Sequence, residues 1–238
     1  MNTVIHKADS RGLADHGWLK SFHTFSFAGY HDPSRMHFGL LRVLNDDSVA
    51  PGMGFGKHPH DNMEIISIPL DGALEHSDSM GNVAVIKKGD VQVMSAGTGV
   101  VHSEKNHSDA AEVKFLQIWV FPNKKNVKPR YDQQTFPEDA IKNQLVTIVA
   151  PMGNTEGVNI HQDAWFSLGS LDKGTQINYS LHKKDNGLYA LILEGDVKIN
   201  DTILNRRDGV GISIPEDVSI EAINDARILL MEVPMTLP

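Results

Sequence analysis

Two short motifs in this sequence combine residue types that could bind a metal ion. The first contains His58 and His60, and the second, further along the chain, contains His102 and Glu104. In a β-strand, residues i and i+2 point to the same side, so each motif could present two ligands to one point. If the two strands are neighbours, three imidazoles and one carboxylate converge on a single metal.

This set of ligands restricts the metal and its use. The chain has no cysteine, which excludes disulfides, thiolate nucleophiles and Cys-ligated zinc or iron–sulfur sites. Three imidazoles and a carboxylate leave one or two positions free on a six-coordinate ion, as a catalytic metal requires. We therefore predict one divalent transition metal in an open site, with Fe(II) preferred and Ni, Mn, Cu, Co and Zn as alternatives.

Two neighbours of the first motif leave its geometry open. Pro59 predicts an irregular or edge strand, since proline is confined in sheets to edges, strand starts and bulges. Glu64 follows His60 by four residues, so an undistorted strand would aim it inward as well. Glu64 could replace Glu104 as a ligand, hydrogen-bond a ligating imidazole, or be a partly buried carboxylate with a local partner.

The elements that must position these residues are predicted to be strands. Short β-rich segments alternate with turn residues, a pattern typical of an all-β sandwich or barrel. The clearest are Met63–Leu70, Val91–Met94, Phe115–Phe121, Leu145–Val149, Tyr189–Leu193 and Ile228–Val233.

Two further segments complete this picture. The aromatic stretch Gly17–Tyr30 is expected to cover the barrel. Its predicted core residues are Trp18, Phe22, Phe25 and Phe27. The polar stretch Pro122–Gln134 has no periodicity and is predicted to be a connector that leaves the first barrel.

A weak internal repeat predicts two copies of one β-rich unit. Leu70-Asp71-Gly72 is followed by Gly89-Asp90-Val91, and Leu193-Glu194-Gly195 is followed at similar spacing by Asp208-Gly209-Val210. Two copies indicate two stacked jelly-roll barrels. We expect residues 1–122 to form the metal-binding barrel and residues 123–238 to form the second.

The second copy is predicted to lack metal ligands. Counting back from its Leu-Glu-Gly turn places Leu181 and Lys183 where the first copy has His58 and His60. The segment equivalent to His102 spans residues 218–220 and contains no histidine. This barrel is therefore expected to be a packing partner of the first.

Composition narrows the function classes. The net charge is −8 among 238 residues, which disfavours direct binding to nucleic acid or anionic membranes. No apolar run reaches the length of roughly 20 residues that spans a bilayer, and the N-terminus has no signal-peptide core. The sequence predicts a cytoplasmic protein without a membrane partner, and we expect a monomer.

The motifs together resemble those of the pirins, a family of the cupin superfamily. The matching words lie in the first half of the chain: GWLKSFHTFSFA from Gly17, FGKHPHDNME from Phe55, HSDSMGN from His76, MSAGTG from Met94, His102-Ser103-Glu104 and Gln117-Ile118-Trp119. The resemblance implies a bicupin fold with metal in the N-terminal barrel only. It also implies that the ligands are His58, His60, His102 and Glu104, which favours Glu104 over Glu64.

The resemblance implies an oxidoreductase. Bacterial pirins of this kind are associated with quercetin 2,3-dioxygenase activity, which opens the heterocycle of a flavonol with O2 and releases CO. A small phenolic or flavonol substrate and O2 are then the expected partners. Glu104 would be both ligand and general base for the flavonol hydroxyl.

A different class of function is also implied. Other pirins act as regulators that bind a transcriptional or metabolic protein partner. In these pirins the redox state of the metal sets the shape of the surface. In that hypothesis turnover is incidental. A protein partner whose binding depends on the oxidation state of iron would distinguish this regulatory function from catalysis.

Overall fold

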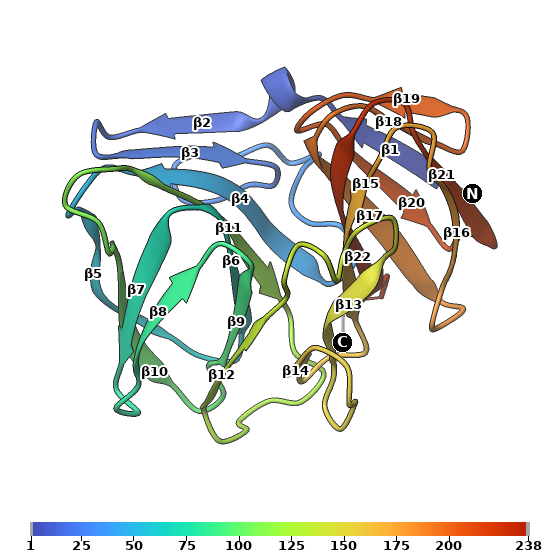
Figure 1. Ribbon diagram of the computed structural model, residues 1–238. Coiled ribbons are helices and arrows are strands. Elements are labelled where there is room, and N and C mark those ends of the chain that lie inside the picture. The colour runs from blue at the N-terminus through green and yellow to red at the C-terminus, as the bar shows by residue number, and fades with distance from the viewer. Residues whose placement is uncertain (1, 237–238) are drawn as a thin grey trace.

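The computed structural model describes residues 2–236, and their regular secondary structure is almost entirely β-strand (Figure 1). The helix found in this range is the single 3-10 turn η1 (Ala8–Ser10). Within residues 2–236 no helix has the length and apolarity needed to cross a membrane. The all-β prediction is confirmed, and each predicted strand is present.

The first barrel pairs a seven-stranded sheet with a four-stranded sheet. In spatial order the larger sheet contains β12 (Arg130–Thr135), β9 (Asp90–Ser95), β6 (Glu64–Asp71), β11 (Val113–Val120), β4 (Leu41–Val49), β3 (Leu19–His23) and β2 (Gly12–Asp15). The smaller sheet contains β5 (Gly54–His60), β10 (Val100–Asn106), β7 (Ala73–Asp78) and β8 (Val83–Lys87).

The second barrel repeats this arrangement, which confirms the two-barrel prediction (Figure 1). Its larger sheet contains β1 (Asn2–His6), β20 (Gly209–Ser213), β17 (Asn186–Glu194), β22 (Ala226–Pro234), β15 (Trp165–Leu171), β13 (Val146–Pro151) and β14 (Val158–Ile160). Its smaller sheet contains β16 (Gln176–Ser180), β21 (Asp217–Ala222), β18 (Val197–Ile199) and β19 (Thr202–Leu204).

The two seven-stranded sheets pack against each other and share the largest apolar core. Alternate residues of each central strand therefore face different cores. In β6, Ile66 and Ile68 belong to the core between the barrels, whereas Ile65 packs inside the first barrel. Burial on both faces explains why this strand has a continuous apolar sequence instead of an alternating one.

Strand pairing links the barrels across the predicted domain boundary. β1 precedes the first barrel in sequence but pairs with β20 of the second, from Asn2 opposite Ser213 to His6 opposite Gly209. β12 pairs with β9 of the first barrel, so the predicted connector is wrong where it overlaps this strand. Its polar sequence fits an edge strand. The division into residues 1–122 and 123–238 stays a proposal, since pairing crosses it twice.

Deletion of residues 2–6 is expected to destabilise the second barrel. The deletion removes the ladder to β20 and the 2.8 Å hydrogen bond between His6 Nδ1 and the buried hydroxyl of Tyr189. At about 1 kcal/mol per hydrogen bond and 2–4 °C per kcal/mol, we expect the melting temperature to fall by about 10 °C. The half-exposed Val4 and Ile5 provide a control, because changing both to Thr keeps the ladder. An unchanged melting temperature after deletion would contradict a stabilising role for β1.

The burial of the aromatic N-terminal segment agrees only in part with the prediction. Phe25 is fully buried in the core between the barrels. Trp18 is half-buried and packs against an apolar core cluster of the first barrel. Phe22 and Phe27 are only half-buried, so their assignment to the core is wrong. Arg11 and Lys20 lie over the ring of Phe22, where a cationic side chain covers its exposed face.

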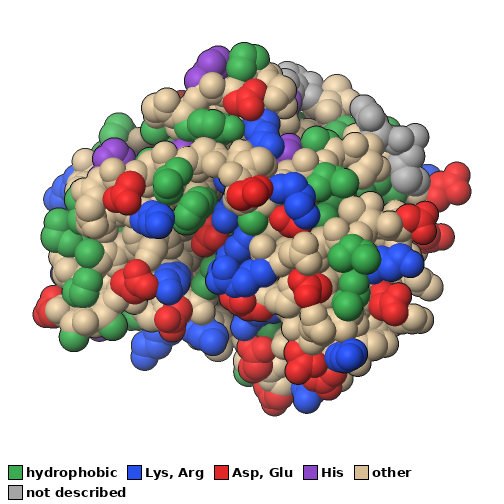
Figure 2. Space-filling model, turned by 90° about the horizontal axis from the view of Figure 1, so that it is seen from above, with side chains coloured by type: hydrophobic (Ala, Val, Ile, Leu, Met, Phe, Trp, Pro, Cys, Tyr) green, Lys and Arg blue, Asp and Glu red, His purple; other side chains and the backbone are tan. Residues whose placement is uncertain are grey.

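Basic side chains gather with acidic ones where the two barrels meet (Figure 2). Asp46 of β4 accepts from Arg11 at 3.2 Å and from Arg207 of the second barrel at 3.0 Å. Lys7 and Asp208 form another ion pair across this junction. Because these cations are paired with carboxylates, the face seen in Figure 2 has no purely basic surface of the kind that nucleic acids require.

Candidate metal centre

The two predicted motifs lie on neighbouring strands. β5 is the edge strand of the four-stranded sheet and pairs with β10, which places His58 opposite His102 and His60 opposite Val100. An edge strand accommodates Pro59, because its missing N–H is not needed by a second neighbour. The pairing confirms that the two strands carrying the motifs are adjacent.

Three imidazoles meet at one point. The Nε2 atoms of His58 and His102 are 2.9 Å apart, and one nitrogen from each of His58, His60 and His102 lies within 4.8 Å of the others. The Nδ1 atom of His58 lies 2.8 Å from the Gly56 carbonyl oxygen. Because a carbonyl only accepts, Nδ1 carries the proton and Nε2 offers its lone pair to the centre.

Burial favours the neutral, metal-binding form of His60 and His102. It lowers the pKa of His60 to about 4, with a further contribution from neighbouring His58. It lowers the pKa of His102 to about 3, again with the nearby histidines adding to the effect. A neutral imidazole has the free lone pair that a metal ligand needs.

Glu104 lies deeper in the barrel, and two neighbours hold its carboxylate. Ser67 Oγ lies 3.1 Å from Glu104 Oε1, and Gln117 Nε2 donates to Oε2 at 2.8 Å. Burial raises the pKa of Glu104 to about 7, against the opposing effect of these two hydrogen bonds. A carboxyl group with such a pKa can accept and release a proton near neutral pH.

The structure divides the predicted ligands between two overlapping groups. One consists of His58, His60 and His102, and the other of His102, Glu104 and His76, all three of which are buried. A register shift between β5 and β10 falls at His102 and Glu104. The extra residue lies in β5, because β10 pairs regularly with β7. His102 and Glu104 are both on the buried face of β10, as predicted.

Sequence reasoning did not select His76 as a site residue. The signal that could have found it is the i, i+2 pair His76 and Asp78 in the pirin-like word HSDSMGN, the same spacing as in the two chosen motifs.

The donor set fits a metal ion. Two imidazole nitrogens bound at about 2.1 Å and at a right angle lie about 3.0 Å apart, close to the 2.9 Å between His58 and His102. Several buried polar atoms inside this barrel, Asn45 Oδ1 and Gln92 Oε1 among them, have no hydrogen-bond partner within residues 2–236. Unpaired polar atoms of this kind commonly face water or an ion.

Glu64 lies on the opposite side of its sheet from the three histidines. The chain leaves β5 at His60, turns through Asn62 at a φ of 46°, and enters β6 in the other sheet. Glu64 therefore shares the face of Ile66 and bonds Ser95 at 2.7 Å. The even offset from His60 would aim Glu64 at the metal only within one continuous strand.

Replacing Glu64 by Gln is expected to stabilise the protein at alkaline pH. Burial raises the pKa of Glu64 from 4.5 to about 7. The native state thus keeps a proton that the unfolded chain has lost, and wild-type stability falls as the pH rises from 4.5 to 7. At pH 8 the variant should gain about 3 kcal/mol. Urea unfolding of both proteins at pH 5 and pH 8 measures this, and parallel pH dependences would contradict it.

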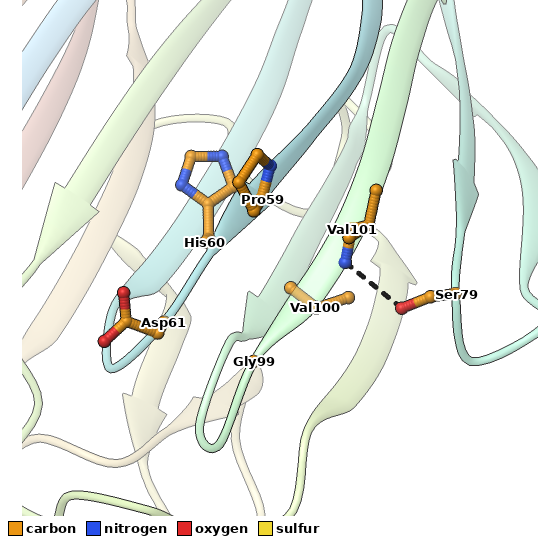
Figure 3. A pocket seen from close by; sticks show the side chains of 7 residues that line it. All are labelled: Pro59, His60, Asp61, Ser79, Gly99, Val100 and Val101. Carbon is orange, nitrogen blue, oxygen red and sulfur yellow. Dashed lines mark hydrogen bonds between the residues drawn. The ribbon is translucent and has the colours of Figure 1, made fainter.

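His60 also borders an open pocket at the mouth of the barrel. The pocket has a volume of about 280 Å³. Figure 3 shows its lining residues, which are Pro59, His60, Asp61, Ser79, Gly99, Val100 and Val101. Trp119 lies on the other side of His60, with ring centroids 4.9 Å apart. Of the three histidines, His60 lines this pocket.

Different residues occupy the corresponding place in the second barrel. Pairing of β16 with β21 sets Tyr179 opposite Val218, and Leu181, predicted from spacing to match His58, lies just beyond the end of β16. Tyr179 donates at 2.8 Å to the fully buried Glu232. That carboxylate also accepts from His182 Nδ1, Asn186 Nδ2 and the backbone N–H groups of His182 and Lys183. These donors satisfy Glu232 without a metal.

The chain matches two family models. The pirin model matches residues 5–120, and the model described as the quercetinase C-terminal cupin domain matches residues 147–233. Quercetin 2,3-dioxygenase of Escherichia coli strain K12 is 40% identical over 97% of this chain and 98% of its own length. A pirin-like protein of Caulobacter vibrioides is 40% identical over 94% of this chain and 96% of its own.

A solved structure matches along the whole chain. It is the bacterial pirin YhhW of Escherichia coli in complex with nickel(II). It is 37% identical, covers 99% of this chain and 100% of its own, and superposes with a TM-score of 0.93. The agreement extends to both barrels.

Proposed function

The chain belongs to the pirin family, and from that premise we propose that it is a metal-dependent dioxygenase that opens flavonols such as quercetin with O2. The observation that carries the proposal is the convergence of three imidazoles beside a buried carboxylate. Relatives of similar length that are named quercetin 2,3-dioxygenase support it, as does the nickel(II) complex of a bacterial pirin.

We propose His58, His60, His102 and Glu104 as the metal ligands. His58 and His60 are half-buried at the mouth, while His102 and Glu104 lie below them. The ion, when bound, would act as a Lewis acid for a phenolic oxygen and leave positions open for O2. Fe(II) is our proposed metal among the several that such a donor set accepts, and elemental analysis of freshly purified protein checks it.

Glu104 is the proposed base for the 3-hydroxyl proton of the flavonol. Gln117 Nε2 keeps one carboxylate oxygen in place, and Ser67 contacts the other. The Ser67 hydroxyl is also 3.1 Å from Gln117 Oε1. It can therefore donate to the charged carboxylate, or turn to Gln117 and accept from Glu104 once that group holds the proton.

The mouth of the barrel suits a flat aromatic substrate. Trp119, Met63 and Met80 pack around Val100 beside His60. Phe27 meets Trp119 edge to face at 5.3 Å. Aromatic and thioether side chains contact aromatic ligands favourably and exclude water from the reacting oxygen.

The test combines metal loading with a flavonol assay. Protein reconstituted separately with Fe(II), Ni(II), Mn(II), Co(II), Cu(II) or Zn(II) is mixed with quercetin under O2. We expect at least one form to consume quercetin and O2 in equal amounts and to release CO. Metal-free protein is the control. No loss of flavonol absorbance and no CO with any metal would refute the proposed activity.

We place catalysis before the regulatory alternative for one reason. Relatives of this chain from Escherichia coli are named quercetin 2,3-dioxygenase, which is the name of an enzyme. We further propose that the protein works as a monomer in the cytoplasm. Light scattering of the metal-loaded protein measures its mass, and a value above that of one 238-residue chain would contradict the monomer.

A further inference from the structure

A second histidine–carboxylate pair stands beside the proposed ligands on the neighbouring strand. β7 pairs with the far side of β10, which places Asp78 opposite His102 and His76 opposite Glu104. His76 Nε2 lies 2.9 Å from Asp78 Oδ2, and both side chains are fully buried. Neither residue is part of the proposed ligand set.

Asp78 fixes the proton position on His76. Its Oδ1 atom accepts the backbone N–H groups of Met80 at 2.9 Å and Asn82 at 3.1 Å. The side-chain amide of Asn82 donates to Oδ2 at 2.9 Å. Because both oxygens of Asp78 accept N–H groups from this turn, Asp78 is an acceptor and His76 Nε2 must donate. In the neutral ring, Nδ1 of His76 is then a free acceptor.

His102 lacks the outer hydrogen bond that His58 has. A metal-bound histidine usually donates its second ring N–H to an acceptor that fixes the ring, and His58 does so toward the Gly56 carbonyl. His102 directs Nε2 at His58, which leaves its Nδ1 as the donor. That atom and His76 Nδ1 are both buried without a partner within residues 2–236.

The two unpaired nitrogens are chemically complementary, one a donor and the other an acceptor, but they do not hydrogen-bond each other in this structure. The ring centroids of His76 and His102 are 5.4 Å apart. At that separation, aligned imidazole rings reach a nitrogen–nitrogen distance of about 3 Å, so a rotation of the rings would join the two atoms. The two oxygens of Glu104 already contact Ser67 and Gln117. Tyr131, which packs on His76, donates its hydroxyl to Gln133.

We propose that His76, held by Asp78, is the acceptor that positions the ligand His102 through its Nδ1 proton. The inference rests on the proposed metal site and adds a chain from Asp78 through His76 to His102. Such an outer partner makes a ligand more basic and restricts the rotation of its ring. His76 is thus a positioning residue that acts on the metal through His102.

Three variants separate hydrogen bonding from packing. His76→Leu removes the acceptor, whereas His76→Gln can present its amide oxygen to His102 and its N–H to Asp78. Asp78→Asn retains His76 but offers it an N–H donor instead of an acceptor, which moves the ring proton to Nδ1 and abolishes acceptance from His102. His107→Gln is the matched control, because His107 is exposed and bonds Glu75 on the surface of the same sheet.

The measurements are Ni(II) affinity by chelator competition and the visible absorption spectrum of the Co(II)-loaded protein. We expect His76→Leu and Asp78→Asn each to weaken Ni(II) binding by about 10–100-fold and to shift the Co(II) bands. His76→Gln should stay within about threefold of wild type and keep its spectrum. Circular dichroism and melting temperature check folding.

Two results would overturn the positioning role. One is Ni(II) binding by His76→Leu or Asp78→Asn within about threefold of wild type. The other is equal weakening in all three variants together with lower melting temperatures, which would make His76 a packing residue. Failure of folded wild type to bind Ni(II) or Co(II) would instead refute the proposed metal site itself.

Discussion

Changing His102 to alanine is expected to abolish metal binding and flavonol oxidation together. His102 belongs to both groups of potential ligands and is almost fully buried. Loss of an outer hydrogen bond to a ligand already costs 10–100-fold in metal affinity, so loss of the ligand should cost more than about 100-fold. His58→Ala should have the same effect, because the Nε2 atoms of the two rings face each other at 2.9 Å.

Metal content by elemental analysis and quercetin turnover are measured on the same preparations. His58→Ala is the more informative variant for folding, since His58 is half-buried at an edge strand and its removal leaves no closed cavity. His107→Ala, at an exposed position after β10, is the matched control and should keep both properties. A variant that loses its metal and retains turnover would contradict metal-dependent catalysis.

Changing Glu104 to glutamine is expected to separate metal binding from turnover. Glutamine preserves the shape of the side chain, and its amide can accept from Gln117 Nε2 while donating to Ser67 Oγ. The amide oxygen remains a weak metal ligand, so we expect the variant to keep part of the metal affinity and to be fully loaded at high metal concentration. Without a basic carboxylate, turnover should fall by about 100-fold or more, the usual contribution of a general base.

The decisive comparison is kcat at saturating metal. A kcat loss of the expected size in fully loaded Glu104→Gln protein supports the base, and retained turnover would refute it. Glu64→Gln is the matched carboxylate control, because Glu64 is equally buried but lies on the other face of β6. It should keep both metal and turnover.

The two barrels divide stability and chemistry between them. An apolar cluster fills the interior of the second barrel, and its residues include Tyr179, Val218 and Ile220. The interior of the first barrel instead contains buried polar side chains such as Asn45 and Gln92, some of whose polar atoms have no partner. Buried polar groups destabilise a fold unless they are paired. The apolar core between the barrels offsets part of that cost. The second barrel therefore stabilises the first, although it has no metal ligands of its own.

Local spacing predicted those parts of the site that depend on one strand at a time. Alternation along β5 places His58 and His60 on one side, as expected. The same rule failed for Glu64, because the chain turns at Asn62 into another sheet. It also gave no reason to prefer His76, since an i, i+2 pair indicates a shared face but not what that face meets.

The sequence by itself determined the all-β class, the duplication, the family and the paired spacing of the ligand motifs. These follow from residue types and short periodicities that the chain carries locally. Only the tertiary structure decided the register of His58 against His102, the place of His76 beside them, and the pairing of β1 and β12. Strand partners and register are set by packing between segments distant in sequence. Three histidines therefore become one candidate metal centre only when the barrel closes.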